Sequence, residues 1–135
     1  MPDTQGQCLC GDLRFEADFP SKWVAHCHCS LCQRAHGAGV VTWVGFATDA
    51  VRVHDPASRL RWYASTPGAE RGFCGRCGST LFFRSERWPG ELHIVRSNFT
   101  GPVDREPQVH VHVDSQAPWL HLADDGLPRK RAPGG

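Results

Sequence analysis

Seven cysteines stand in three short clusters, and their spacing suits zinc better than disulfide bonds. The clusters occupy residues 8–10, 27–32 and 74–77. Thiolates two or three residues apart can reach one ion, because a short turn brings both sulfurs to within roughly 2.3 Å of zinc. The same neighbours make poor disulfide partners, since a disulfide requires a particular dihedral angle and Cα separation. An odd number of cysteines also leaves one thiol over. The sequence therefore predicts two zinc sites.

The way in which the cysteines divide decides which site could do chemistry. In one division, the outer clusters form a closed four-thiolate site of the structural kind, made by Cys8, Cys10, Cys74 and Cys77. The middle cluster then forms a three-ligand site of the catalytic kind, with an open fourth position, made by Cys27, Cys29 and Cys32. A rival division would combine residues 29–32 with residues 74–77. The stretch between them, residues 33–73, is much longer than the roughly 15–20 residues usual for such a motif. The rival division also leaves three cysteines without partners. Spacing therefore favours one site with four cysteines and another with three.

The three-thiolate site suits a soft ligand. Three thiolates on Zn²⁺ leave a local charge of −1, so the metal is only a modest Lewis acid. An incoming thiol could take the fourth position and bind as thiolate. Two alternatives stay open: a histidine such as His26 or His28 could close a second structural site, or the three thiols could serve redox chemistry.

The elements expected to position these clusters are mainly short strands. Alternating apolar residues or β-branched and aromatic runs predict strands at residues 13–17, 40–46, 51–53, 60–63, 80–83, 92–95 and 109–113. Pro-Gly and Asp-Pro pairs separate several of them. The 14 glycines and 10 prolines agree with many turns. One helical turn is expected at Ser30–Ala35, capped by Ser30 and ended by Gly37 and Gly39.

Length and charge bound the remaining possibilities. The 135 residues fit a single domain, expected at 1–127, followed by a basic, proline- and glycine-rich segment at 128–135 that is expected to be a flexible tail. The net charge of +1 predicts neither nucleic-acid nor membrane binding. Residues 2–6 are polar and no run approaches a membrane span, so we expect a cytoplasmic protein with reduced cysteines. The oligomeric state is not predicted.

The motifs also resemble those of a known family. The chain resembles the glutathione-dependent formaldehyde-activating enzymes, or S-(hydroxymethyl)glutathione synthases, whose wider family includes centromere protein V. The resemblance extends from Gly6 to Pro128, and its most specific parts are HCHCSLCQ at 26–33, RGFCGRCGS at 71–79 and Pro118-Trp119. It implies a β-tent domain with two zinc ions. Matched residue by residue, Cys8, Cys10, Cys74 and Cys77 would bind the structural ion. Cys27, Cys29 and Cys32 would bind the catalytic ion.

The resemblance further implies a carbon–sulfur lyase that interconverts S-(hydroxymethyl)glutathione with glutathione and formaldehyde. The chain departs from the family at His112, where an aromatic residue is usual. The motifs mark the broad family, so a related thiol remains open. Arg34, Arg71 and Arg76 are candidates to bind the thiol's carboxylates. The competing hypothesis is a non-catalytic, zinc-stabilised protein-binding module. The strand aromatics are expected in the core rather than in a pocket, namely Trp43, Phe46, Trp62, Phe73, Phe82 and Phe83.

Overall fold

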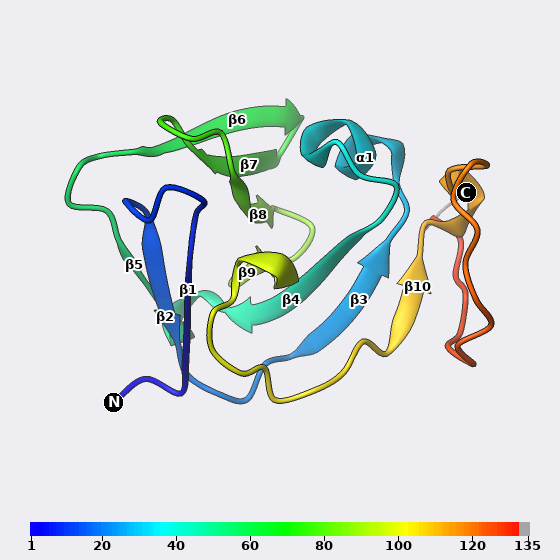
Figure 1. Cartoon of the computed structure of the whole chain (residues 1–135), viewed down its shortest axis with the longest axis horizontal. Coiled ribbons are helices and arrows are strands. Elements are labelled where there is room, and N and C mark those ends of the chain that lie inside the picture. Colours follow the sequence, from blue (N-terminus) through cyan, green and yellow to red (C-terminus); the bar gives the residue numbers. More distant parts are fainter. Residues whose placement is uncertain (133–135) are drawn as a thin grey trace.

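The computed structural model describes residues 1–132 and shows a mainly β protein with two sheets (Figure 1), which confirms the predicted fold class. The smaller sheet has the strand order β1-β2-β5, with β1 at Thr4–Gln7, β2 at Arg14–Ala17 and β5 at Val51–His54. The larger sheet has the order β10-β3-β4-β9-β8-β7-β6. Its strands are β3 (Trp23–Cys27), β4 (Val41–Ala47), β6 (Leu60–Thr66), β7 (Ala69–Cys74), β8 (Thr80–Ser85), β9 (Glu91–Val95) and β10 (Val109–Val111).

The helical segments within residues 1–132 are short, and all but the last lie between strands. They are α1 (Ser30–His36) and the 3₁₀ turns η1 (Thr48–Ala50), η2 (Arg96–Asn98) and η3 (Val113–Ser115). Among the described residues, no helix is long and apolar enough to cross a membrane.

The strand pairs are antiparallel with one exception, which lies beside the middle cysteine cluster. β10 pairs with β3 in parallel, so that His110 is opposite His26 and Val111 is opposite Cys27. The strand predicted at 109–113 ends early, because His112 adopts the left-handed conformation with φ 57°. The late part of the chain is thereby placed against the strand that carries the first cysteine of that cluster.

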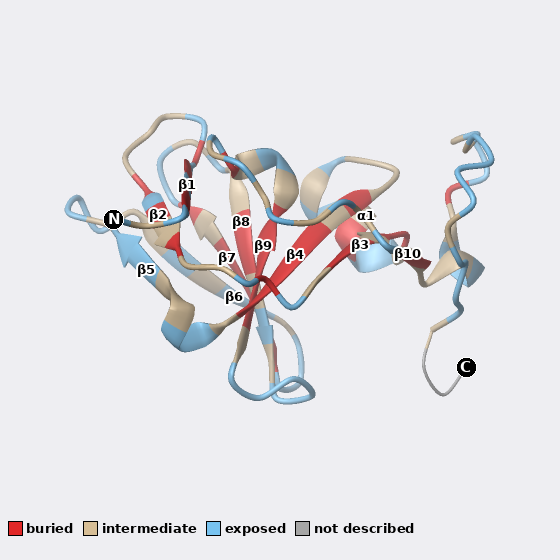
Figure 2. Cartoon of the chain, turned by 90° about the horizontal axis from the view of Figure 1, so that it is seen from below, coloured by how far each residue is buried: buried red, intermediate tan, exposed pale blue. Residues whose placement is uncertain are grey.

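The core lies around the central strands of the larger sheet, where Figure 2 shows buried residues on β4 and β9. Val44 and Phe46 of β4 are fully buried and belong to one hydrophobic cluster with Phe82 and Ile94. The cysteines are shared between two such clusters. The outer-cluster cysteines belong to the main core, whereas the middle-cluster cysteines pack with Trp43 in a smaller one.

Helix α1 is capped by a cysteine. Ser30 was expected to be the cap, but Cys29 is the N-cap residue, and its sulfur accepts a hydrogen bond from the Cys32 backbone N–H at 3.3 Å. Gly37 ends the helix, as expected, in the left-handed conformation with φ 61°. The helix therefore fixes the relative position of two cysteines of the middle cluster.

The basic segment after residue 127 runs beside β10. The His110 N–H donates to the Pro128 carbonyl at 2.9 Å, the Lys130 N–H donates to the His110 carbonyl at 2.8 Å, and the Val113 N–H donates to the Lys130 carbonyl at 3.0 Å. The expected flexibility of residues 128–135 stays a prediction, and residues 133–135 lie outside those described. Pro128, Lys130 and Ala132 nevertheless have defined hydrogen-bond partners.

Candidate metal centres and cleft

The two outer cysteine clusters come together at one point in the fold. Their sulfurs lie within 4.8 Å of one another, and they belong to Cys8, Cys10, Cys74 and Cys77. Two of the sulfur–sulfur distances are 3.5 Å for Cys8–Cys10 and 3.8 Å for Cys10–Cys74. A tetrahedral zinc site with bonds of roughly 2.3 Å has sulfur–sulfur edges of about 3.8 Å. The geometry therefore fits a closed zinc site.

Two glycine turns place these sulfurs. Gly11 and Gly78 each follow the last cysteine of a cluster and have φ of 84° and 80°, a conformation that suits glycine because it lacks a Cβ. The Gly11 N–H donates to the Cys8 carbonyl at 3.2 Å, and the Gly78 N–H donates to the Cys74 carbonyl at 2.8 Å. Each turn directs the two sulfurs of its cluster to the same side.

The middle cluster forms a separate group of three sulfurs, also within 4.8 Å of one another, from Cys27, Cys29 and Cys32. Cys27 ends β3, Cys29 caps α1 and Cys32 lies in the first turn of the helix. Among the described residues, no fourth histidine, cysteine or carboxylate ligand atom joins this group. The donor set suits a soft metal ion, and a four-coordinate ion bound by these three sulfurs would have one position free.

The three sulfurs line a cleft of about 380 Å³. Its other walls are largely aromatic and aliphatic, from Trp23, Ala25, Trp43, Phe83, Trp88, Val109 and Val111. Polar and charged side chains complete the lining, namely Arg71, His93, His112, Lys130 and Arg131. Trp43 and Phe83, which were expected only in the core, thus form part of the cleft. A volume and lining of this kind are typical of a small-molecule site.

Arg71 is the charged group in closest contact with the middle cluster. It is 7% exposed, and both of its terminal nitrogens donate to the Cys32 sulfur at 3.6 Å. Its guanidinium also lies over the Phe83 ring, 5.2 Å from the centroid. Arg71 was a candidate carboxylate ligand, but its terminal nitrogens are directed at the Cys32 sulfur instead. If the three cysteines bind a metal as thiolates, this positive charge would offset part of their negative charge.

The other two candidate arginines lie elsewhere. Arg76 donates to Asp12 at 3.1 Å beside the outer clusters, and Arg34 is exposed on α1. Neither lines the cleft.

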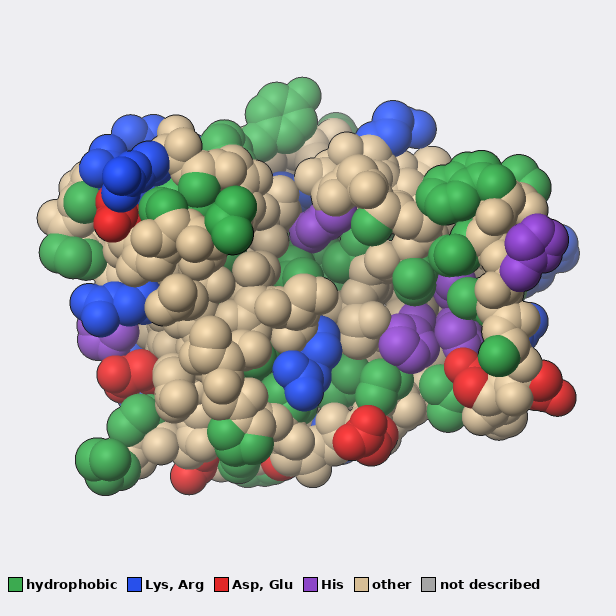
Figure 3. Space-filling model, viewed as in Figure 1, with side chains coloured by type: hydrophobic (Ala, Val, Ile, Leu, Met, Phe, Trp, Pro, Cys, Tyr) green, Lys and Arg blue, Asp and Glu red, His purple; other side chains and the backbone are tan. Residues whose placement is uncertain are grey.

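The histidines beside the middle cluster face away from its sulfurs. His28 Nε2 is 2.8 Å from His110 Nδ1, and His110 Nε2 is 2.7 Å from Asp125 Oδ2. His26 Nδ1 is 2.7 Å from the Thr42 hydroxyl. Figure 3 shows histidine surface beside carboxylate surface on the side where β10 and the C-terminal segment lie. In this arrangement His28 and His26 hold the strands together and do not close the middle cluster.

Burial and mutual contact set the pKa values near the cleft. Hydrogen bonding from Cys27 lowers the pKa of the Cys29 thiol, and the same interaction raises the pKa of Cys27. The three sulfurs thus share their protons unless a cation replaces them. Burial, with a smaller effect from the Arg71 charge, lowers the pKa of His36 to about 4. His36 is therefore neutral near pH 7.

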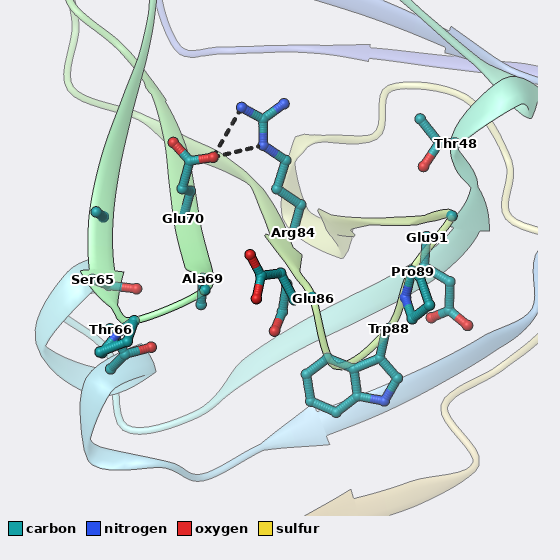
Figure 4. A pocket seen from close by; sticks show the side chains of 15 residues that line it. Thr48, Ser65, Thr66, Ala69, Glu70, Arg84, Glu86, Trp88, Pro89 and Glu91 are labelled. Carbon is teal, nitrogen blue, oxygen red and sulfur yellow. Dashed lines mark hydrogen bonds and ion pairs between the residues drawn. The ribbon is translucent and has the colours of Figure 1, made fainter.

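A second, larger cavity of about 870 Å³ lies beside the turns of the β6–β7 and β8–β9 hairpins (Figure 4). Its lining contains no cysteine or histidine, and three of its four charged groups form ion pairs. Arg84 pairs with Glu70 at 3.0 Å, and Glu91 pairs with Lys22 at 3.4 Å. Trp88 lines both cavities. This groove lacks the reactive groups that distinguish the cysteine-lined cleft.

The fold defines a mainly β protein in which two cysteine groups could each bind a metal ion, and one of these groups lines a cleft. The profile of the glutathione-dependent formaldehyde-activating enzymes matches residues 3–115. The chain belongs to this family.

Two curated proteins are similar to the chain. One from Halomonas elongata, called a putative glutathione-dependent formaldehyde-activating enzyme, is 30% identical over 125 residues, which cover 87% of this chain and 80% of the relative. An uncharacterized lyase from Schizosaccharomyces pombe is 30% identical over 83 residues, covering 62% and 58%.

Among solved structures, the crystal structure of a Rhodobacter sphaeroides protein is similar, with a TM-score of 0.61 and 25% identity. The match covers 75% of this chain and 92% of that one.

Proposed function

We propose that the chain is a zinc-dependent carbon–sulfur lyase that interconverts S-(hydroxymethyl)glutathione, or a related thiol adduct, with glutathione and formaldehyde. The observation that carries the proposal is the position of the middle cluster. Cys27, Cys29 and Cys32 all line the cleft, and no fourth ligand from residues 1–132 joins them. Membership of the formaldehyde-activating family and the names of its relatives support the same reaction class.

The proposal assigns different roles to the two cysteine groups. Cys8, Cys10, Cys74 and Cys77 would bind one zinc ion that stabilises the fold, because four thiolates leave no position for substrate. Cys27, Cys29 and Cys32 would bind a second ion. Zinc bound there supplies an open position at which a thiol sulfur is ionised near neutral pH.

The chain's own residues would prepare the reaction. In the forward direction a C–S bond forms between the thiol sulfur and the formaldehyde carbon, and the thiol proton ends on the former carbonyl oxygen. Arg71 reduces the negative charge at Cys32, so that a further anionic sulfur is less strongly repelled. Trp43 and Phe83 limit water in the cleft and hold the two reactants close together. Positioning of this kind provides part of the expected rate.

The test is direct thiol binding by the zinc-loaded protein. Calorimetry should show that glutathione binds with release of a proton, counted in two buffers of different ionisation enthalpy. S-methylglutathione should bind far more weakly, because a thioether cannot provide an anionic sulfur. Metal analysis should give two zinc ions per chain, and mild chelation should remove one first while the fold is kept. Equal affinity for both compounds, with no proton released, would contradict the proposal.

The alternative is a non-catalytic protein-binding module. That hypothesis predicts a middle cluster closed by a histidine and an exposed apolar patch in place of a cleft. The partners of His26 and His28 and the cysteine-lined cleft favour the lyase. A cytoplasmic location remains a prediction.

A further inference from the structure

Two cationic side chains at the cleft come from the segment after residue 127. Lys130 and Arg131 both line the cleft that contains the middle cluster. They lie beyond residue 115, where the match to the family profile ends. The family match therefore gives no information about these two residues.

Hydrogen bonds hold the backbone of this segment in place before and after Arg131. Lys130 forms two backbone hydrogen bonds with β10 and the residues after it. The Lys130 N–H donates to the His110 carbonyl, and the Val113 N–H donates to the Lys130 carbonyl. The Ala132 N–H donates to the Asp114 carboxylate at 3.1 Å. Arg131 lies between these anchored positions. The two charges are thus attached to a defined wall of the cleft.

The charges in the cleft are unbalanced. Arg71, the third cation, is directed at the Cys32 sulfur. Within residues 1–132, neither the Lys130 nor the Arg131 side chain has an ion pair or a hydrogen bond, and no aspartate or glutamate lines the cleft. The cleft therefore offers two positive charges to a ligand and no carboxylate to bind an ammonium group.

We infer that Lys130 and Arg131 form an anion subsite for the carboxylates of the thiol substrate. The cleft then selects anionic thiols that carry no ammonium group. The inference rests on the proposed function, because the thiol sulfur has to lie at the middle cluster. Glutathione has two carboxylates that suit the subsite, but its α-ammonium group would find two like charges and no partner. The same molecule without that group is the better match.

Binding experiments with three thiols test the selection. The probes are glutathione, glutaryl-cysteinyl-glycine, which is glutathione without its ammonium group, and N-acetylcysteine amide, which has no carboxylate. Their Kd values would be measured by calorimetry on the zinc-loaded full chain. We expect glutaryl-cysteinyl-glycine to bind about fivefold or more tightly than glutathione, and the neutral thiol to bind most weakly. Added salt should weaken the anionic thiols only.

A double variant tests the residues. Lys130→Gln with Arg131→Gln should weaken glutaryl-cysteinyl-glycine about tenfold, since exposed charge-assisted contacts each contribute modestly. The Kd of the neutral thiol should stay within about twofold, which also reports an intact cleft. Arg129→Gln is the matched control, because Arg129 belongs to the same segment, donates to the Ala123 carbonyl and does not line the cleft. It should bind all three thiols as the unchanged protein does.

The outcomes separate the two proposals. Equal binding of glutaryl-cysteinyl-glycine by the double variant and the unchanged protein would overturn the subsite and leave the lyase proposal standing. Tighter binding of glutathione than of glutaryl-cysteinyl-glycine would overturn the selection against ammonium. Failure of all three thiols to bind the zinc-loaded protein would overturn the proposed function and this inference together.

Discussion

The two cysteine groups differ in how far apart their members lie in the chain and in what surrounds them. The outer clusters, residues 8–10 and 74–77, come from distant parts of the chain and join in the main core, where Cys8 is 1% and Cys74 0% exposed. The middle cluster spans only residues 27–32 and lines a cleft. A metal in the first group would close a long loop, whereas a metal in the second would link neighbours that β3 and α1 already hold close together. Stability and reactivity are therefore expected in different places.

The arginines near the two cysteine groups differ in their hydrogen-bond partners. Beside the outer clusters, Arg59 and Arg76 bind the carboxylate of Asp12 at 3.0 and 3.1 Å. These contacts, led by the hydrogen bond from Arg59, hold the pKa of Asp12 below its usual range. At the middle cluster, Arg71 donates to a cysteine sulfur. The main partner of Arg59 and Arg76 is thus a carboxylate, whereas both terminal nitrogens of Arg71 donate to a cysteine sulfur.

The largest effect is expected from Cys77→Ser. Loss of one thiolate from the outer group should remove the loop-closing metal and destabilise the domain by several kcal/mol. Thermal unfolding of the variant and of Cys32→Ser, both in excess zinc, provides the comparison. If Cys32→Ser lowered Tm more than Cys77→Ser, the roles of the two groups would be exchanged.

Cys32→Ser should have the opposite profile. The variant should keep its fold, because β3 and α1 are also held by backbone pairing, but lose about 100-fold or more of its activity. The formation of the thiol–formaldehyde adduct, corrected for the uncatalysed reaction, measures the loss. Activity within a few-fold of the unchanged protein would show that the middle cluster is not the reactive one.

Substitutions at Arg71 sharpen the difference in electrostatics. Arg71→Met should lower kcat/KM about tenfold, because the Cys32 sulfur loses two N–H donors and a nearby positive charge. Its stability should change by only about 1 kcal/mol, since a buried charge is replaced by an apolar side chain. The kcat/KM of Arg71→Lys should lie between those of Arg71→Met and the unchanged protein, because lysine keeps the charge but not the planar pair of donors. Equal activity of the unchanged protein and both variants would show that Arg71 does not contribute to the proposed reaction.

The smallest effect concerns pH. The pKa of His36 is lowered from 6.5 to about 4 in the folded protein, chiefly by burial. Between these values the unfolded chain binds the proton first, so stability is full above about pH 6.5 and falls toward pH 4. The full shift corresponds to roughly 2–3 kcal/mol over this range. His36 is only half-buried and water screens part of the effect, so His36→Gln should lessen the loss by about 1 kcal/mol. Denaturant unfolding at pH 7 and at pH 4.5 measures it. The other histidines remain in both proteins, so an identical pH dependence would contradict the assignment.

The sequence predicted the strands that carry a clear apolar pattern, but not three others. β1, with the sequence TQGQ, has no apolar residue, β3 contains Cys27, which spacing assigned to a metal, and β7 is interrupted by Gly72. In each case pairing with neighbours overrides a weak local pattern. The helix was predicted almost to its bounds because Gly37 is an unambiguous stop signal.

The grouping of the cysteines was also predictable from spacing, although their role as ligands remains a prediction. The cleft was not predictable, because its walls come from separate parts of the chain. Trp43 and Phe83 lie on β4 and β8, and Lys130 approaches only because the last segment turns back along β10. A basic run near the end of a sequence carries no local sign of the strand it will contact.

The course of the last segment affects how the protein can be handled. Arg131 lines the cleft, and only four residues would separate it from anything fused after Gly135. A purification tag at that end, especially one rich in histidine, would have both the reach to cover the cleft and the donor atoms to compete for its metal. The first residue lies on the other side of the molecule, beside the smaller sheet (Figure 1). An affinity handle for this protein therefore belongs at the N-terminus.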